Sequence, residues 1–222
     1  MTEQVRSRER VASHGEVFTS EREVNAMLDL VKQETERVDS RFLEPACGDG
    51  NFLAEILRRK LEAAKKRATP PKRKKPLPLE FERQSVIAVS SIYGIEILPD
   101  NATACRERLY DIWNKEYETV CKKEVSDECR DAVRFILSRN IVCGDALTYR
   151  TAEDKPITFS EWTPIAGSMQ FSRRDFQFDF LVTQSHQYSL FDEQGEAQSF
   201  DEPVRTYPPL HYTQLYRYEE QL

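Results

Sequence analysis

The chain has 222 residues, of which 39% are hydrophobic and 32% are charged, so its apolar content suffices for one core and is low for two. No run approaches the roughly 20 apolar residues of a membrane span, and the polar N-terminus lacks the apolar stretch of a secretory signal, which predicts a soluble, cytoplasmic protein. The net charge of −6 disfavours a protein that holds DNA by overall charge alone, and five cysteines without Cys-x-x-Cys spacing disfavour a disulfide framework or a structural zinc site.

The first predicted elements are a loose or helical arm over residues 1–14 and a helix over Glu21–Glu36. Apolar residues of that helix recur at three- and four-residue steps and form one stripe. Ser20, with Glu23 three residues later, is a capping-box signal for the start of the helix.

A short apolar run at Arg41–Pro45 predicts a strand that enters the turn Ala46–Gly50. A helix is expected from Asn51, because the apolar residues that follow share one face. This helix should end before Pro70, since proline interrupts the hydrogen bonding of a helix.

Charge is concentrated in the segment that follows. Residues 58–75 hold ten Lys and Arg against one Glu, whereas residues 192–222 hold seven acids against two Arg. The prolines and charged runs of residues 67–84 predict a flexible basic insertion, which is either solvated or in contact with nucleic-acid phosphates. The candidate nucleic-acid contacts are Lys72, Arg73, Lys74 and Lys75.

The rest of the chain alternates strands and helices. Residues 85–97 are rich in β-branched side chains and predict one or two buried strands. Residues 151–177 are expected to be irregular, and residues 183–222 form an acidic aromatic tail that either packs on the domain or stacks on bases. The later elements are helices over Pro99–Lys122 and Asp127–Ser138 and strands over Asn140–Cys143 and Phe178–Val182. Successive strand–turn–helix units predict a parallel sheet, with a ligand site at the carboxyl ends of its strands.

The sharpest motif is the string Glu44-Pro45-Ala46-Cys47-Gly48-Asp49-Gly50, between the first strand and its helix. Its glycines allow a tight turn and the close approach of a ligand. The string is not a P-loop, because no Gly-Lys-Ser/Thr follows, and it lacks the Gly-x-Gly-x-x-Gly spacing of a nicotinamide fingerprint. An acid ahead of the glycines suits a cationic ligand group; the alternative is an ordinary strand-to-helix turn.

Two further acids follow predicted strands. Glu96, in the run Gly94–Asp100, can accept both hydroxyl groups of a ribose. Asp145, after Gly144, can accept a hydrogen bond from an adenine amino group. Taken singly, the first also fits a solvated strand end and the second an ordinary turn.

These three motifs, in this order, resemble the S-adenosylmethionine-dependent DNA methyltransferases, specifically the N6-adenine enzymes of restriction–modification systems. The likeness covers residues 13–147, and the string PACGDGNFL at Pro45–Leu53 is its most specific part. An upstream segment, His14–Ser20, looks like the family's Gly-x-[Phe/Val]-[Phe/Tyr]-Thr-Pro stretch, with serine in place of proline. Because that stretch covers the cofactor in the family, we expect residues 1–40 to form an N-terminal helical segment over the cofactor site.

The resemblance implies an α/β, Rossmann-like class I methyltransferase fold, with a mostly parallel sheet, helices on both faces and an incomplete set of strands. It implies an S-adenosylmethionine-binding domain at residues 41–182 and DNA as a partner. In the family the glycine loop holds the methionine moiety, the second acid the ribose and the third the adenine. The implied cofactor contacts are Phe18, Thr19, Glu44, Pro45, Ala46, Gly48, Gly50, Phe52, Glu96, Ile97, Asp145 and Ala146. No metal is expected, because the three histidines are too scattered for a site.

One family motif is absent. After the fourth strand these enzymes carry an Asn-Pro-Pro-Tyr tetrapeptide, whose Asn and a backbone carbonyl bind the target amine and whose ring stacks on the flipped base. Here the corresponding stretch is Thr183–Tyr188, in which Gln184 and Tyr188 are the candidate catalytic substitutes. The 40 residues after Val182 are too few for the remaining strands and a target-recognition domain.

Three functions therefore stay open. The first is a DNA adenine-N6 methyltransferase, or the methylase subunit of a restriction–modification system. The second is a non-catalytic S-adenosylmethionine-binding subunit whose protein partner supplies base recognition or catalysis, which the missing tetrapeptide favours. The third is a methyltransferase acting on RNA, protein or a small molecule, which the Pro-Ala-Cys-Gly string disfavours.

Overall fold

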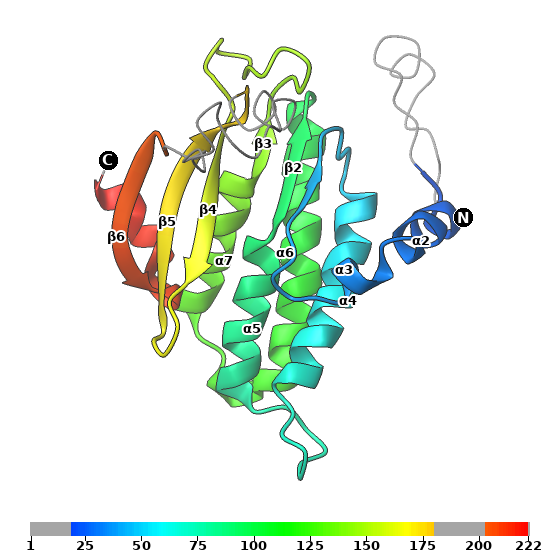
Figure 1. Ribbon diagram of the computed structural model, residues 1–222, viewed down its shortest axis with the longest axis vertical. Helices are drawn as coiled ribbons and strands as arrows, with labels where there is room; N and C mark the ends of the chain where they lie inside the picture. Colours follow the sequence, from blue (N-terminus) through cyan, green and yellow to red (C-terminus); the bar gives the residue numbers. More distant parts are fainter. Residues whose placement is uncertain (1–18, 180–202, 222) are drawn as a thin grey trace, which may run out of the picture.

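The computed structural model describes residues 19–179 and 203–221, which form two three-stranded sheets and a layer of helices (Figure 1). The strands are β1 (Phe42–Glu44), β2 (Ile92–Glu96), β3 (Ile141–Cys143), β4 (Thr158–Pro164), β5 (Gln170–Gln177) and β6 (Arg205–His211). The helices are α2 (Glu21–Asp29), α3 (Lys32–Thr35), α4 (Asn51–Arg67), α5 (Pro78–Ser90), α6 (Pro99–Cys121) and α7 (Asp127–Asn140), with 3-10 helices η1 (Lys122–Glu124) and η2 (Tyr212–Gln221). None of these helices is long and apolar enough to cross a membrane.

The first sheet is parallel, in the order β1-β2-β3. Glu44 of β1 lies opposite Gly94 of β2, and Glu96 lies opposite Cys143 of β3, so the carboxyl ends of all three strands meet at one edge. This confirms the predicted parallel sheet. We call this edge the strand-end edge.

The two faces of the parallel sheet are covered differently. Ile92 packs in a core with α4, α5, α6 and α7, whereas Tyr93 and Ile95, which point to the opposite face, pack against Ile157 and Phe159. Helices were expected on both faces, but among the described residues β4 and the segment before it cover the second face. The apolar surface that a helix was expected to bury on this face is buried instead by side chains such as Phe159 of β4.

Most of the predicted helices are confirmed. Ser20 and Glu23 form the predicted capping box at the start of α2. The expected helix over Glu21–Glu36 is interrupted after Asp29 and resumes as α3. Helices α4, α6 and α7 begin at the predicted residues, and α4 ends before the proline pair.

A buried lysine of α4 fixes the approach to β1. The side chain of Lys60 is fully buried, and its Nζ donates to the backbone oxygens of Arg37 and Val38 at 3.0 and 3.1 Å. The same atom donates to Oγ of Ser91 at 2.9 Å. These bonds satisfy the carbonyl groups of the α3–β1 connection, so α4 determines where β1 begins.

The largest departure from the predicted elements is α5. It occupies part of the expected strand region 85–97, and the expected flexible insertion 67–84 shortens to a loop at residues 68–77. Nearly every residue of α5 from Phe81 to Ser90 is buried. A helix buried on all sides has no polar face and therefore no helical periodicity, so its β-branched residues resemble a strand in the sequence.

The second sheet is antiparallel, in the order β4-β5-β6. It corrects two expectations, because residues 151–177 are largely regular rather than irregular and the strand ends at Gln177 instead of beginning at Phe178. Phe178 and Asp179 are helical. The rest of the strand predicted to Val182 lies outside the described residues.

A buried arginine organises this sheet. Arg173 of β5 is 2% exposed, and its Nε and Nη2 donate to the two carboxylate oxygens of Asp175 at 2.9 and 2.8 Å. Its guanidinium also lies 4.2 Å from the ring centre of Tyr207 and 5.5 Å from that of Tyr218. These aromatic residues of the tail are therefore packed against the domain, which was one of the two predicted alternatives.

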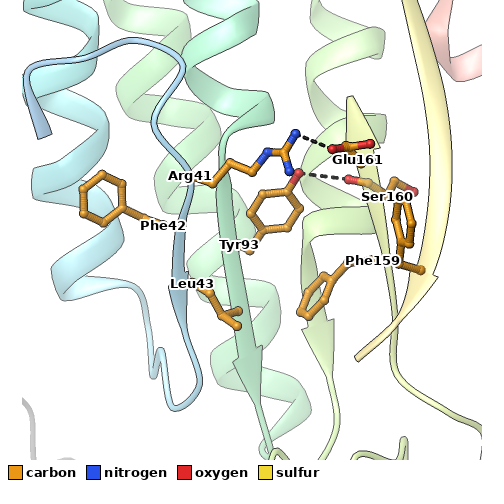
Figure 2. A pocket seen from close by; sticks show the side chains of 8 residues that line it. Arg41, Phe42, Leu43, Tyr93, Phe159, Ser160 and Glu161 are labelled. Carbon is orange, nitrogen blue, oxygen red and sulfur yellow. Dashed lines mark hydrogen bonds and ion pairs between the residues drawn. The ribbon is translucent and has the colours of Figure 1, made fainter. Parts of the chain in front are cut away.

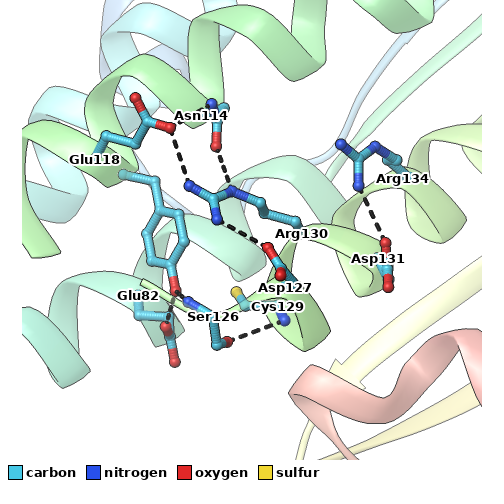
Figure 3. Close-up of polar contacts among 10 residues, drawn as sticks. Glu82, Asn114, Glu118, Ser126, Asp127, Cys129, Arg130, Asp131 and Arg134 are labelled. Atoms are coloured by element: carbon cyan, nitrogen blue, oxygen red, sulfur yellow. Dashed lines mark hydrogen bonds and ion pairs between the residues drawn. The ribbon is translucent and has the colours of Figure 1, made fainter. Parts of the chain in front are cut away.

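Polar contacts join α6 to α7 beside this core (Figure 3). Arg130 of α7 donates to Asn114 and Glu118 of α6 at 3.0 and 2.9 Å. Oγ of Ser126 caps α7 by accepting the N–H of Cys129 at 3.2 Å. The backbone N–H of Ser126 donates to the hydroxyl of Tyr117 at 3.0 Å. These bonds fix the N-terminus of α7 against the C-terminal half of α6.

Candidate functional site

Glu96 lies at the centre of the strand-end edge. Its side chain is 7% exposed, and Oε2 accepts the N–H of Gly48 at 2.8 Å while Oε1 accepts the N–H of Leu98 at 2.9 Å. Its backbone oxygen accepts the N–H of Gly144 at 2.9 Å. One residue therefore joins the three loops that the sequence motifs singled out.

The turn between β1 and α4 depends on its glycines. Gly48 and Gly50 have φ angles of 55° and 91°, in the left-handed region that glycine adopts without strain. A Cβ at Gly50 would lie 2.8 Å from Sγ of Cys105 on α6. The thiol of Cys47 also contacts Cys105, and this contact and burial raise the pKa of the Cys47 thiol, so Cys47 is a neutral packing group rather than a nucleophile.

Glu44 supplies a second acid at the entrance to the turn. Burial raises the pKa of its carboxyl group, and a hydrogen bond from the backbone of Ala46 acts in the opposite direction. Pro45 and Ala46 are exposed. A half-buried carboxylate beside an open turn is a suitable partner for an ammonium group.

Asp145 is held by a turn after β3. Its Oδ1 accepts the N–H of Leu147 at 2.8 Å, and its backbone pairs with Arg150. A Cβ at Gly144 would lie 2.8 Å from the backbone oxygen of Arg150, so only glycine fits there. Asp145 is therefore fixed in place beside the end of β2.

Apolar side chains follow two of these acids in the sequence. Ile97, directly after Glu96, is 55% exposed. Asp145 is followed by the half-buried Ala146 and then by Leu147, which is 89% exposed. Exposed aliphatic side chains next to acids offer a surface for a flat ring with polar edges. Ile97 and Ala146 are among the predicted cofactor contacts, whereas Leu147 is not.

Arg108 is a residue of this site that no motif indicated. It lies on α6, and its Nη1 donates to Asn51 Oδ1 at 2.7 Å and to Asp49 Oδ1 at 3.2 Å. Asn51 in turn donates from Nδ2 to the backbone oxygen of Thr19 at 3.2 Å. Thr19 thus lies beside the start of α4.

Four predicted cofactor or catalytic residues remain. Phe52 packs against the helical core. Phe18, Gln184 and Tyr188 lie outside the described residues, so their roles stay predictions. Within residues 19–179 and 203–221, no group of three or more His, Cys, Asp or Glu side chains could hold a metal ion.

The four basic candidates are far from the strand-end edge. Lys72–Lys75 are exposed in the 68–77 loop, which Figure 1 shows at the bottom of the molecule, whereas β2 points to the top. Helix α4 begins at the glycine turn and runs 17 residues to this loop, which corresponds to about 25 Å. The structure therefore does not bring the predicted nucleic-acid contacts to the predicted cofactor contacts.

A hollow of about 220 Å³ opens beside β1, on the face of the sheet away from the helices (Figure 2). Leu43, Tyr93 and Phe159 give it a mostly apolar lining. An ion pair between Arg41 and Glu161 lies at its rim. None of the predicted site residues lines it, so it is separate from the strand-end edge.

Comparison with known proteins gives one result. The family model described as MmeI, DNA-methyltransferase domain, matches residues 18–172, which is well over half of the chain and includes all three strand-end loops. No curated protein and no solved structure matches the chain significantly. With its parallel sheet, glycine turn and strand-end acids, the chain belongs to the MmeI DNA-methyltransferase domain family, of the restriction–modification type.

Proposed function

We propose that the chain binds S-adenosylmethionine at the strand-end edge and transfers its methyl group to N6 of adenine in DNA. The observation that supports this most is the hydrogen bond from Gly48 to Glu96, which joins the glycine turn to the acid of the next strand. The side chains at the edge suit this cofactor, because they offer acids for its ammonium and hydroxyl groups and an aliphatic surface, at Ile97, for its adenine.

Each acid has a distinct task in this proposal. Glu44 binds the ammonium group of the methionine moiety. Glu96 binds the ribose hydroxyls, since each of its oxygens has a second lone pair beyond the backbone N–H that it accepts. Asp145 accepts from the adenine amino group, and the turn at Gly48 and Gly50 lets the cofactor approach the backbone.

When bound, S-adenosylmethionine supplies a methyl group on a sulfonium, which an amine takes by direct displacement. The residues of the chain contribute alignment rather than covalent chemistry. Glu96 is held by two backbone N–H groups before any ligand arrives, so its orientation costs little on binding.

A second candidate function is a cofactor-binding subunit that needs a partner for catalysis and base recognition. The absence of Asn-Pro-Pro-Tyr from the sequence favours it. The amide of Gln184 is one methylene longer than that of Asn, and Tyr188 lies four residues beyond it, where the tetrapeptide places its ring three beyond. Misplacements of this size lower rates about 100-fold. A partner would then dock on the acidic segment 191–222.

Methyl transfer from radiolabelled S-adenosylmethionine to DNA, RNA and protein separates these functions. We expect label in N6-methyladenine of DNA, weak for the isolated chain and stronger when co-purifying partners are present. Strong adenine methylation by the isolated chain, abolished by Gln184→Ala, would contradict the need for a partner. Label confined to RNA or protein would contradict DNA as substrate.

Cofactor binding is tested independently of catalysis. Titration calorimetry with S-adenosylhomocysteine should give a measurable heat, and the ligand should raise the melting temperature of the protein. Neither heat nor thermal shift at millimolar ligand would remove the cofactor assignment, whatever the fold.

A further inference from the structure

One cation of α6 contacts both the glycine turn and the first residue of α4. Nη1 of Arg108 donates to Asn51 Oδ1 at 2.7 Å, to Asp49 Oδ1 at 3.2 Å and to the backbone oxygen of Asp49 at 3.4 Å. The side chains of Arg108 and Asp49 are 35% and 27% exposed, so solvent screens their attraction only in part.

Asn51 extends this contact to the covering segment. Its Oδ1 accepts from Arg108, and its Nδ2 donates to the backbone oxygen of Thr19. Arg108 therefore acts on the turn directly and, through Asn51, on the residue that precedes the cap of α2.

The same helix also packs against the turn at Gly50. Cys105 lies three residues before Arg108, on the same side of α6, and its Sγ occupies the space next to Gly50. Gly48 and Gly50 give the turn its shape but no stiffness, because glycine backbones have wide conformational freedom. The turn is restrained on the side of β2 by the hydrogen bond from Gly48 to Glu96, and on the side of α6 by packing at Cys105 and by hydrogen bonds at Arg108.

We infer that Arg108 is a positioning residue for the methionine end of the cofactor. This inference rests on the proposed function, in which the turn at Glu44–Gly50 holds that end of the molecule. Arg108 holds the turn in its binding geometry without touching the cofactor. Affinity for ligands with the amino-acid group therefore depends on Arg108, whereas affinity for the adenosine half does not.

Two ligands that differ only at this end test the inference. S-Adenosylhomocysteine carries the ammonium and carboxylate groups, and 5′-methylthioadenosine has the same adenosine and thioether without them. By calorimetry, Arg108→Met should weaken binding of S-adenosylhomocysteine about ten-fold or more and leave binding of methylthioadenosine unchanged. Arg108→Lys, which keeps the charge but loses the planar fork, should lie between parent and Arg108→Met.

Arg134→Met is the control, because it removes the same kind of arginine–aspartate pair, Arg134–Asp131 at 3.0 Å, from a more exposed position on α7. It should change neither affinity. Equal weakening of both ligands by Arg108→Met would indicate a general structural role and overturn the inference, as would no weakening of either. A parent that binds neither ligand would overturn the proposed function, and the inference with it.

Hydrogen exchange of the ligand-free protein gives a second readout. Arg108→Met should speed exchange of the amides at residues 47–51 and leave those at residues 141–143 unchanged. Unchanged exchange at the turn would show that Arg108 does not fix it, and would overturn the inference even if affinity fell.

Discussion

Glu96 shows how one side chain can be both a ligand group and a part of the fold. From the sequence alone, an acid at a strand end that faces a ligand supports little of the core. In the structure it is 7% exposed and accepts two backbone N–H groups. Its loss is therefore expected to affect stability as well as binding.

We predict that Glu96→Ala weakens binding of S-adenosylhomocysteine by about 1–3 kcal/mol, the usual contribution of charge-assisted hydrogen bonds. The free energy of unfolding should also fall by about 2 kcal/mol, because the half-buried N–H groups of Gly48 and Leu98 lose their acceptor. Calorimetry and urea unfolding measure the two effects. Glu107→Ala, which removes an exposed acid of α6, is the control and should change neither.

An unchanged dissociation constant for Glu96→Ala would place Glu96 outside the site. Unchanged stability would show that its carboxylate does not bond to the turn in solution. The two results are independent, so either role of Glu96 can fail alone.

Glu44 predicts a dependence of binding on pH. Its pKa is raised above the ordinary 4.5 by burial, and only the ionised carboxylate attracts the ligand ammonium group. As pH falls from 7 through this raised pKa, protonation of Glu44 should therefore weaken binding of S-adenosylhomocysteine. Glu44→Gln should bind weakly at pH 7 and show a flatter profile. Identical pH profiles for the parent and Glu44→Gln would exclude Glu44 from the ammonium site.

Some residues of the site can be predicted from the sequence, and others cannot. Glu44, Glu96 and Asp145 each end a strand or follow one, so the order of motifs in the sequence was enough to predict that they gather at one edge. Arg108 lies in the interior of α6, where an arginine is unremarkable. Its role depends on the packing of α6 against the turn, which no local pattern encodes.

At the scale of elements, the turn between β1 and α4 offers a test of its fit to α6. Gly50 and Gly167 both have positive φ, 91° and 73°, but a Cβ at Gly167 would meet nothing within 4 Å, whereas one at Gly50 would lie 2.8 Å from Cys105 Sγ. Both Gly→Ala variants carry a backbone penalty of about 1 kcal/mol. Gly50→Ala should lose at least about 1 kcal/mol more, from overpacking.

Urea unfolding of the two variants measures this difference. Adding Cys105→Ala to Gly50→Ala should recover part of the extra loss, because it removes the sulfur atom that the new Cβ meets. Equal losses at Gly50 and Gly167 would mean that the turn does not rest on α6.

Two of the elements that escaped prediction did so for opposite physical reasons. Helix α5 is buried on nearly all sides, so it lacks the polar face that reveals a helix. Strand β5 places Arg173 and Asp175 inward, so the alternation of apolar and polar residues that reveals a strand is broken. In both cases long-range packing, rather than the local pattern, decides which residues are buried.

At the scale of the whole molecule, the basic loop is set apart from the site. Lys72–Lys75 are exposed at the far end of α4, and the hydrogen bond from Cys121 to the backbone of Pro78, at 3.5 Å, places the start of η1, with Lys122 and Lys123, beside the same end. If this end of the protein binds DNA, it would therefore contact a different stretch of the DNA backbone from one that reaches the strand-end edge.

We predict that replacing the four residues Lys72, Arg73, Lys74 and Lys75 with Ala flattens the dependence of DNA affinity on salt, by about 0.9 in the log–log slope for each phosphate that the loop no longer neutralises. Affinity for S-adenosylhomocysteine should not change. Fluorescence anisotropy over a salt series measures the slope. A variant with Lys32→Ala and Arg134→Ala, which removes two ion-paired cations elsewhere, is the control. If the quadruple variant binds DNA like the parent at every salt concentration, the loop takes no part.

The distance between the basic loop and the strand-end edge also bears on how the protein meets DNA. A molecule of net charge −6 that carries a cluster of four cations at one end has an electric dipole, and the field of DNA phosphates exerts a torque on such a dipole before the two molecules touch. If the loop binds DNA as predicted, the protein arrives with this loop first and with the strand-end edge turned away. Under the proposed function, capture of DNA and presentation of a base to the cofactor would then be successive events, and the second would require the protein to rotate on the duplex or to bend it.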